Sequence, residues 1–254
     1  METIEIKDVN GVVLFSHTAE NNSITLTVET AVACGVSLAK ANLAGACLAG
    51  ADLEGAKLEW ANLEDANLAW ADLADAILIG ANLEDTNIKD ANLKGAFLIR
   101  ANLKGANLAW ANLEGVLLYG AKLHGANLSG AKLYGADLNG AKNIPFIPLS
   151  CPEEGAFVAW KKVDGYFLVK IQIPEDARRT SATTRKCRCD KAMVLDITSL
   201  DGEEHYNEVT NNNYKETVYK VGEIVYPDSF DENRWNECSH GIHFFVNKED
   251  AINY

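Results

Sequence analysis

The sequence has 254 residues, of which 48% are hydrophobic, enough to supply the cores of two or three modules. Its formal net charge of −13 disfavours direct binding to nucleic acid or to an anionic membrane surface. The first five residues lack the basic start and apolar core of a signal peptide, and no apolar run reaches membrane-spanning length. The six cysteines are too unevenly spaced for a secreted disulfide framework. We therefore expect a cytoplasmic protein with reduced thiols.

Residues 1–35 are expected to form an N-terminal module. Alternating apolar residues and the pair Asn10-Gly11 predict a β-hairpin over residues 3–16 with a tight two-residue turn. Ser23 is placed as the N-cap of a short helix whose apolar residues have helical spacing, and Gly35 follows its end. Because this helix leads directly into the next segment, we expect it to cap that segment and cover its open edge.

A five-residue unit with the consensus Ala-Asn/Asp-Leu-X-Gly dominates the middle of the chain. Every fifth residue from Leu38 to Leu138 is Leu, with the single exception of Ile88. A period of five would scatter these leucines around an α-helix. In an extended trio, however, the Ala and Leu side chains point to one side and the Asn or Asp side chain to the other. Gly at the fifth position permits the positive φ of a turn, so each unit reads as one short side and one corner of a narrow coil.

This repeat resembles the pentapeptide repeat family. The resemblance implies a right-handed quadrilateral β-helix over residues 36–142, with four units in each coil and about five coils. It also implies that residues 20 apart lie directly above one another, about 4.8 Å apart. The bore of such a coil is filled by Leu and Ala, so we expect any binding surface to lie on the outside.

Three of the four outer faces are ordinary on this interpretation. Two of them are expected to form structural ladders of stacked side-chain amides. These two ladders are Asn42, Asn62, Asn82 and Asn102, and Asn67, Asn87, Asn107 and Asn127.

The fourth face departs from the family pattern, because bulky apolar residues replace Asn or Asp over three consecutive coils. The expected surface comprises Ile77, Ile79, Phe97, Ile99, Leu117 and Tyr119, with Trp60 at a corner of the same face. An apolar patch of this size indicates an interface. A homodimer is the first hypothesis, since two copies of one ladder can meet around a two-fold axis. Coverage by the C-terminal module or by another protein partner, and simple tolerance of apolar residues at an outward position, remain as alternatives.

A Pro-rich linker is expected at residues 143–150, followed by a small, mainly β, α+β domain over 151–254. Strands are predicted at 156–162 and 166–173 around the turn Asp164-Gly165, at 193–197, as a pair within 214–226, and at 241–246. Short helices are predicted at 174–179 and after Asn247. Through residues 173–179, 186–189 and 238–245 the domain resembles an uncharacterised domain that follows pentapeptide repeats, and this resemblance implies no activity.

One group of residues in this domain has the chemistry of a metal site. Four tetrahedral zinc ligands can be drawn from Cys187, Cys189, Cys238, His240 and His243. Cys-X-Cys with Cys-X-His is a looser pattern than paired Cys-X2-Cys motifs, and buried structural cysteines are the favoured interpretation. No phosphate loop, Gly-X-Ser-X-Gly elbow or His-Glu-X-X-His motif is found, so no catalytic residue is assigned. The basic cluster Arg178, Arg179, Arg185, Lys186 and Arg188 is interpreted as a solvated face with acidic neighbours rather than an anion site.

Two main functional hypotheses follow. The first is a non-catalytic scaffold that binds partners through the apolar face and the C-terminal domain. The second, implied by similarity to the gyrase-protecting pentapeptide repeat proteins, is a DNA mimic that occupies DNA gyrase or another topoisomerase. Glu64, Asp65, Glu84 and Asp85 supply only a local acidic stripe for such mimicry, interrupted by Lys104 and Lys122. A metal-binding, anion-binding or catalytic C-terminal domain is the third hypothesis.

Overall fold

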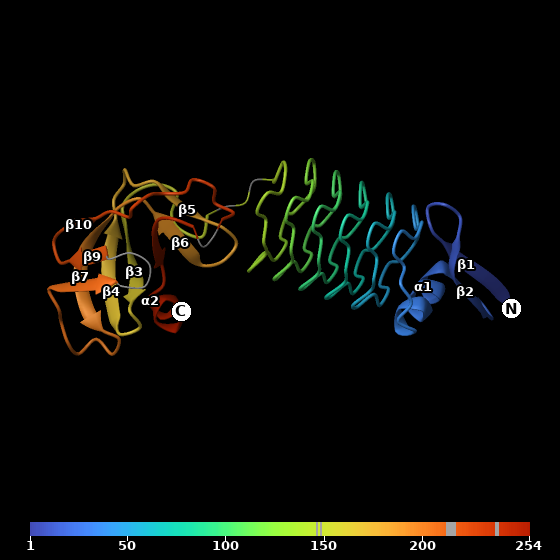
Figure 1. Cartoon of the computed structure of the whole chain (residues 1–254), viewed down its shortest axis with the longest axis horizontal. Helices are drawn as coiled ribbons and strands as arrows, with labels where there is room; N and C mark the ends of the chain where they lie inside the picture. The colour runs from blue at the N-terminus through green and yellow to red at the C-terminus, as the bar shows by residue number, and fades with distance from the viewer. Residues whose placement is uncertain (146, 148, 212–216, 237–238) are drawn as a thin grey trace. The chain divides into compact units, whose positions relative to one another are not determined.

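The structure is a computed structural model that describes residues 1–254 except 146, 148, 212–216, 237 and 238. The chain divides into two compact units, Met1–Ile147 and Pro148–Tyr254. Strands far outnumber helices in the described residues, so the fold class is mainly β, as the sequence predicts (Figure 1).

The first unit opens with a β-hairpin, in which β1 (Glu2–Lys7) pairs antiparallel with β2 (Val13–Ala19). The hairpin is confirmed, but the prediction of a two-residue turn is wrong, because residues 8–12 separate the strands. The Asp8 carboxylate explains the wider connection. Its Oδ1 accepts hydrogen bonds from the backbone N–H groups of Asn10 and Val12 at 2.9 and 2.8 Å, which lowers the pKa of Asp8.

Helix α1 (Ile24–Ala33) is capped as predicted, since the Ser23 Oγ accepts a hydrogen bond from the N–H of Leu26 at 3.1 Å. The helix also supplies an acceptor to the first coil, because Glu29 Oε1 accepts from the N–H of Asp52 at 3.0 Å. The hairpin also supplies a hydrogen-bond acceptor to the first coil, because the N–H of Asn42 donates to the Lys7 carbonyl at 2.8 Å. In later coils the equivalent N–H groups bond to the coil before, so the hairpin and α1 satisfy donors that the first coil leaves open.

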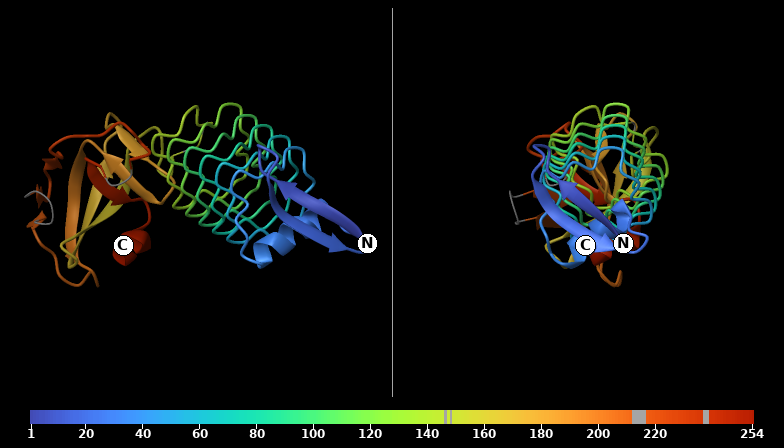
Figure 2. Two further views of the ribbon diagram at one scale, coloured as in Figure 1. Left: turned by 45° about the vertical axis from the view of Figure 1, so that its right-hand side comes forward. Right: turned by 90° about the vertical axis from the view of Figure 1, so that its right-hand side faces the viewer.

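Residues 36–142 wind into a coil whose successive turns stack, as Figure 2 shows from two sides. Parallel pairing joins residues 20 apart throughout, for example Asn42 with Asn62 and Lys122 with Lys142. Each turn therefore contains four five-residue units, and the predicted stacking is confirmed. Backbone hydrogen bonds of 2.7–3.3 Å connect each turn to the next. The coil is held together along its whole length by these bonds, as a sheet is.

The bore of the coil is packed with side chains. Nearly all leucines at the third position of the unit are fully buried, and each gains about 2 kcal/mol on leaving water. Thr86 replaces the usual Ala and is also fully buried, because its hydroxyl donates to the Leu63 carbonyl at 2.7 Å. The corners take positive φ, both at glycines such as Gly45 (φ 65°) and at larger residues such as Trp60 (φ 60°). The interior leaves no room for a ligand.

The second unit is built on a seven-stranded antiparallel sheet with the order β10-β7-β4-β3-β11-β6-β5. Its strands are β3 (Phe157–Val163), β4 (Phe167–Ile173), β5 (Arg179–Ser181), β6 (Lys186–Cys189), β7 (Ala192–Ser199), β10 (Ile224–Val225) and β11 (Ile242–Phe245). A separate ribbon joins β8 (Glu208–Asn211) and β9 (Thr217–Lys220), and helix α2 (Lys248–Asn253) closes the chain. One sheet face packs a core of Val, Ile, Ala and Cys side chains.

Several sequence predictions for this unit are confirmed. The hairpin of β3 and β4 turns at Asp164 and Gly165, both with positive φ, and Asn247 caps α2 through a 2.8 Å bond from the N–H of Glu249. The strands predicted around Gly222 exist as β9 and β10, although β9 pairs with β8 and β10 with β7; Tyr214 lies outside the described residues.

The helix predicted at residues 174–179 is wrong. A single turn there leads into β5, and the Arg179 guanidinium binds the carbonyl oxygens that a helix would use internally. It donates to the carbonyls of Ala177, Pro174 and Glu175 at 3.2, 2.7 and 2.8 Å, and to that of Gly155 at 2.7 Å. These side-chain bonds, which also tie residues 174–179 to the distant Gly155, outweigh the local helix signal of Pro174 and the acids that follow.

Candidate interaction surface

The apolar residues of the fourth face form two stacked columns. We call these two columns, together with Trp60, the apolar ladder surface. Parallel pairing of Ile77 with Phe97 and of Phe97 with Leu117 confirms that the first column is continuous over three coils. Ile79, Ile99 and Tyr119 form the second column two residues further along each coil, because the same 20-residue spacing separates them. From Ile77 to Leu117 the first column spans two coil steps, about 10 Å.

Exposure is concentrated at the aromatic members of this surface. Phe97 is 37% exposed, Tyr119 49% and Trp60 56%. The four aliphatic members, Ile77, Ile79, Ile99 and Leu117, are only half-buried, because neighbours one coil away cover their flanks. The sequence predicted the alignment correctly but not this partial cover, which depends on the close stacking of the coils.

Asn side chains on the other faces make hydrogen bonds that the apolar residues of these three coils cannot make. In an amide ladder, each Asn side chain donates to the Asn one coil before, as from Asn102 to Asn82 at 2.9 Å and from Asn87 to Asn67 at 3.0 Å. Each Asn Oδ1 also accepts from the N–H two residues later, as Asn67 does from Ala69 at 3.2 Å. Both predicted amide ladders are thus confirmed. A hydrocarbon side chain can make neither bond, so the apolar ladder surface lacks this stabilisation on its own face.

Charged residues of opposite sign bound the first column. Lys57 pairs with Ile77 at one end, and Leu117 pairs with Asp137 at the other. In the second column, Glu59 precedes Ile79 and Asn139 follows Tyr119 at the same spacing. Glu59 Oε2 is buried and has no hydrogen-bond partner among the described residues. Sequence reasoning missed these four residues, although one further 20-residue step in each direction would have found them.

Trp60 is held at its corner by the next coil. The indole lies against Gly80, where a Cβ atom would be only 2.4 Å from Cε3 and Cζ3 of the ring. Trp110 lies against Gly130 in the same way. A glycine one coil away thus makes room for each of these rings.

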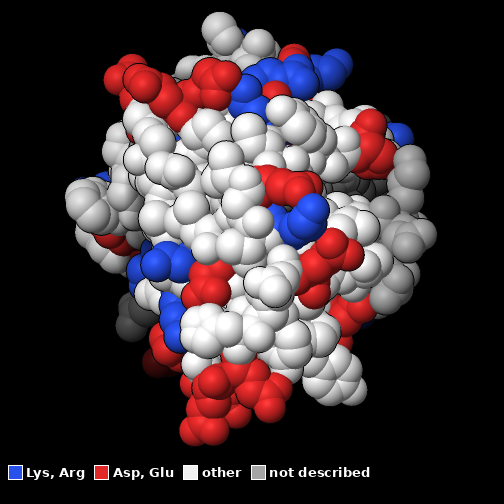
Figure 3. Space-filling model, turned by 90° about the vertical axis from the view of Figure 1, so that its left-hand side faces the viewer, with Lys and Arg blue, Asp and Glu red and all other residues white. Residues whose placement is uncertain are grey.

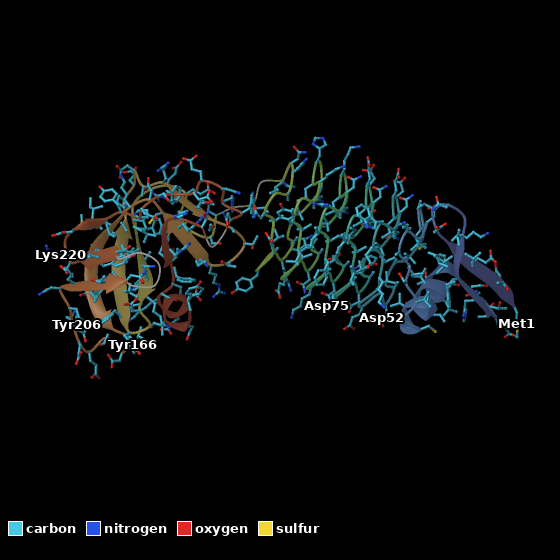
Figure 4. All side chains as sticks on the ribbon, viewed as in Figure 1. Met1, Asp52, Asp75, Tyr166, Tyr206 and Lys220 are labelled. Atoms are coloured by element: carbon cyan, nitrogen blue, oxygen red, sulfur yellow. The ribbon has the colours of Figure 1, made fainter. Side chains whose placement is uncertain are left out.

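The acidic stripe of the coil is partly neutralised. Glu84 forms an ion pair with Lys104, and hydrogen bonds from Lys104 and Asn102 lower the pKa of Glu84. Glu64 Oε2 accepts from the Asn82 amide at 3.0 Å. A second acidic group, Glu29, Asp52, Glu54 and Asp75, lines a hollow of about 620 Å³ between α1 and the coil, where Figure 4 labels Asp52 and Asp75.

The residues of the predicted metal site are only partly brought together. Cys187 and Cys189 lie on β6 opposite Phe244 and Ile242, with both thiols in the core. His243 pairs with Arg188, so strand alternation places its side chain on the opposite face of the sheet. The His240 Nδ1 lies 3.5 Å from Asp228 Oδ1 on the surface, and Cys238 lies outside the described residues. Within the described part of the chain, no three His, Cys, Asp or Glu side chains are arranged to hold a metal ion.

The structure instead places Cys151 close to Cys187, because both lie in one core cluster and the N–H of Ser150 donates to Ser181, the strand partner of Cys187. The neighbouring Cys151 and burial raise the pKa of Cys187, whereas Cys187 and the nearby Arg179 lower the pKa of Cys151. Burial also raises the pKa of Cys189 to about 12 and lowers that of Lys161 to about 8. The pairing joins residues 36 positions apart and left no local signal in the sequence.

The basic cluster is occupied by internal partners. Arg178 forms ion pairs with Asp190 and Glu232, each at 2.8 Å, and Arg185 pairs with Asp250 at 2.9 Å. The Arg188 side chain is buried and donates to the Asn233 carbonyl at 2.9 Å. On the face shown in Figure 3, basic and acidic side chains are interspersed. This agrees with a solvated face with acidic neighbours for Arg178 and Arg185, whereas Arg179 and Arg188 have structural roles.

Comparison with known proteins identifies both parts of the chain. Residues 31–65, 66–105 and 101–140 match the family model of pentapeptide repeats (8 copies), and residues 147–251 match a family of unknown function (DUF5758). The chain is therefore a member of the pentapeptide repeat proteins in which a domain of this second family follows the repeats. No curated protein sequence matches it.

Solved structures of pentapeptide repeat proteins are similar to part of the chain. One from the cyanobacterium Cyanothece 51142 is 48% identical, with 33% of this chain and 57% of that chain covered and a TM-score of 0.33. HetL from Nostoc sp. strain PCC 7120, a protein involved in heterocyst differentiation regulation, is 34% identical, with 39% and 60% covered and a TM-score of 0.20. The protein alr5209, also from Nostoc, is 35% identical, with 39% and 77% covered and a TM-score of 0.29. The chain thus spans less than two thirds of the first two.

Neither helix in the described residues is long and apolar enough to cross a lipid bilayer.

Proposed function

We propose that the protein is a non-catalytic interaction scaffold, and that its apolar ladder surface binds a second copy of the same chain. The observation that carries this proposal is the continuous apolar column Ile77, Phe97 and Leu117, bounded by Lys57 at one end and Asp137 at the other. A hydrophobic centre with a charged rim is the usual anatomy of a protein interface.

The order of charges favours an antiparallel pair. Consider two coils that meet face to face, related by a two-fold axis that runs across the surface at Phe97 and Ile99. Each column then faces the same column of the partner in reverse order. Lys57 faces the partner's Asp137, and Glu59 faces the partner's Asn139. Both pairs occur twice in the dimer, at opposite ends.

The area of the surface predicts a weak dimer. The exposed fractions of Phe97, Tyr119 and Trp60 correspond to about 75, 110 and 140 Å² if each side chain has about 200–250 Å² in total. With the half-buried aliphatic residues, each protomer offers on the order of 450 Å², so the pair buries about 900 Å², just below the lower limit of about 1,000 Å² of total area for a specific interface. We expect a dissociation constant in the micromolar range.

Sedimentation at micromolar concentrations tests this proposal. The expected result is a concentration-dependent mass between monomer and dimer for the natural chain, and a monomer for Phe97→Glu with unchanged thermal stability. Tyr134→Glu is the matched control, because Tyr134 is an exposed aromatic residue on another face of the coil. A natural chain that stays monomeric, or a Phe97→Glu variant of unaltered mass, removes the interface.

DNA mimicry with inhibition or protection of DNA gyrase is the alternative function. It requires a dominant acidic face, and the ion pair of Glu84 with Lys104 weakens the stripe that would supply one. A gyrase supercoiling assay separates the two proposals, since a scaffold of this kind leaves supercoiling unchanged at any concentration at which the chain is a dimer.

For the finer architecture, we propose a right-handed quadrilateral coil over residues 36–142 between a capping module at 1–35 and a linker at 143–150, in a cytoplasmic protein. For the C-terminal domain, 151–254, we propose a second binding module in which Cys187 and Cys189 are core residues. Zinc bound by four ligands drawn from Cys187, Cys189, Cys238, His240 and His243 is the competing proposal. Metal analysis of protein purified without a His-tag decides it, and one equivalent of zinc that is lost in Cys238→Ser would establish the site.

A further inference from the structure

We propose that Cys151 and Cys187 are a reversible redox modification site, at which a peroxide converts the two thiols into an intramolecular disulfide.

The first support is the position of Cys151. The N–H of Ser150 donates to Ser181 Oγ at 2.7 Å, and the Ser150 hydroxyl donates to the Thr184 carbonyl at 2.8 Å. Ser181 on β5 pairs directly with Cys187 on β6. The segment that begins the second unit is therefore fastened to the β5–β6 hairpin, and this places Cys151 beside Cys187.

The second support is the common location of the two residues. Cys151 and Cys187 lie within one core cluster, and each thiol shifts the pKa of the other. Cys189, two residues further along the strand, lies on the same face of the sheet, but it pairs with Arg179 and not with Ser181, to which Ser150 is bonded. Both thiols of β6 approach a backbone carbonyl, Cys187 that of Arg185 at 3.6 Å and Cys189 that of Ile242 at 3.8 Å. The strand register thus selects Cys187, and not Cys189, as the partner of Cys151.

Burial explains why a small oxidant is required. Cys151 is 5% exposed and Cys187 is fully buried, so Cys151 reacts first. Arg179 and Arg234 lie near enough to Cys151 to favour its nucleophilic form. Its sulfur attacks the peroxide O–O bond, which gives a sulfenic acid and releases water. The Cys187 sulfur then displaces the hydroxyl group as a second water, so that two thiols and one hydrogen peroxide yield one disulfide and two waters.

The disulfide closes a loop of 36 residue steps within the second unit. Closing such a loop constrains the unfolded chain. The oxidised protein should therefore unfold at a higher temperature, by on the order of 10 °C for this unit. The bond would fasten the start of the second unit to its sheet until a thiol reductant releases it.

Peptide mapping tests the pairing without any change in the core. The full chain, with the exposed Cys34 and Cys47 changed to Ser to prevent exchange, is treated with hydrogen peroxide, alkylated and digested with trypsin. Cleavage after Arg188 separates Cys187 from Cys189. The expected product joins the Cys151 and Cys187 peptides, disappears with dithiothreitol, and accompanies the rise in unfolding temperature. A product that joins Cys238 to Cys187 or Cys189, or sulfinic acid on Cys151 with no linked peptide, overturns the proposal.

Variants then assign the effect. Cys189→Ser is expected to form the disulfide in the natural amount, whereas Cys151→Ser abolishes both the linked peptide and the temperature shift. Equal loss of the temperature shift in Cys189→Ser would contradict the assigned pair.

Discussion

Substitution of Gly80 by Ala tests the stacking of the coils in one step. The added Cβ would lie 2.4 Å from two ring atoms of Trp60, so the indole must leave its place on the next coil. Gly115 is the matched control, because it has the same φ of 67° and no atom within 4 Å of an added Cβ. Gly115→Ala therefore measures the backbone strain alone, about 1 kcal/mol. Gly80→Ala adds the lost Trp60 packing and should cost about 2–3 kcal/mol in total.

Urea denaturation of monomeric protein measures both losses, and a double-mutant cycle isolates the contact. In a Trp60→Ala background, Gly80→Ala should cost only the strain of about 1 kcal/mol, so the coupling energy should be about 1–2 kcal/mol. The same contrast is expected between Gly130, which lies against Trp110, and Gly50, since both have φ of 69°. Equal losses for Gly80→Ala and Gly115→Ala would refute the ring-on-glycine contact.

Two further predictions concern the capping helix and the second unit. Glu29→Ala leaves the N–H of Asp52 without its 3.0 Å acceptor and should lower the free energy of unfolding in urea by about 1–2 kcal/mol. Glu29→Gln keeps an acceptor oxygen and should lower it by less. Equal losses for the two variants would mean that the bond contributes nothing. Burial holds the pKa of Lys161 at about 8, below its value in the unfolded chain. The unfolded state therefore binds more protons than the folded state above about pH 8. The free energy of unfolding of the second unit should rise between about pH 8 and pH 10. Lys161→Met should remove this rise and should be more stable than the natural chain by about 1–3 kcal/mol at pH 7. If the variant kept the pH dependence of the natural chain, Lys161 would not be the group that causes it.

Regular features of this fold could be predicted because they depend on local chemistry. The five-residue period fixes which residues stack, and Ser23 caps α1 through a bond to a residue only three positions away. Distant contacts were not predictable. The Arg179 guanidinium binds carbonyl oxygens of two segments, at Gly155 and at residues where Pro174 favours a helix. The proximity of Cys151 to Cys187 depends on the fold of the whole domain.

The candidate surface shows both situations. Its alignment followed from the period, and so did the charges at Lys57 and Asp137, which the same step of 20 residues would have placed. The partial burial of the aliphatic members did not follow, since it depends on how closely neighbouring coils cover one another's side chains.

Exchange of the two terminal charges tests the antiparallel dimer most directly. Lys57→Asp and Asp137→Lys each replace two attractive contacts by two repulsive ones, and each should weaken association by about tenfold in sedimentation equilibrium. The double variant restores opposite charges at both ends and should return the dissociation constant to that of the natural chain. Two outcomes would contradict self-association through this face. The first is a double variant in which the two losses of affinity add, and the second is a dissociation constant that none of the three variants changes.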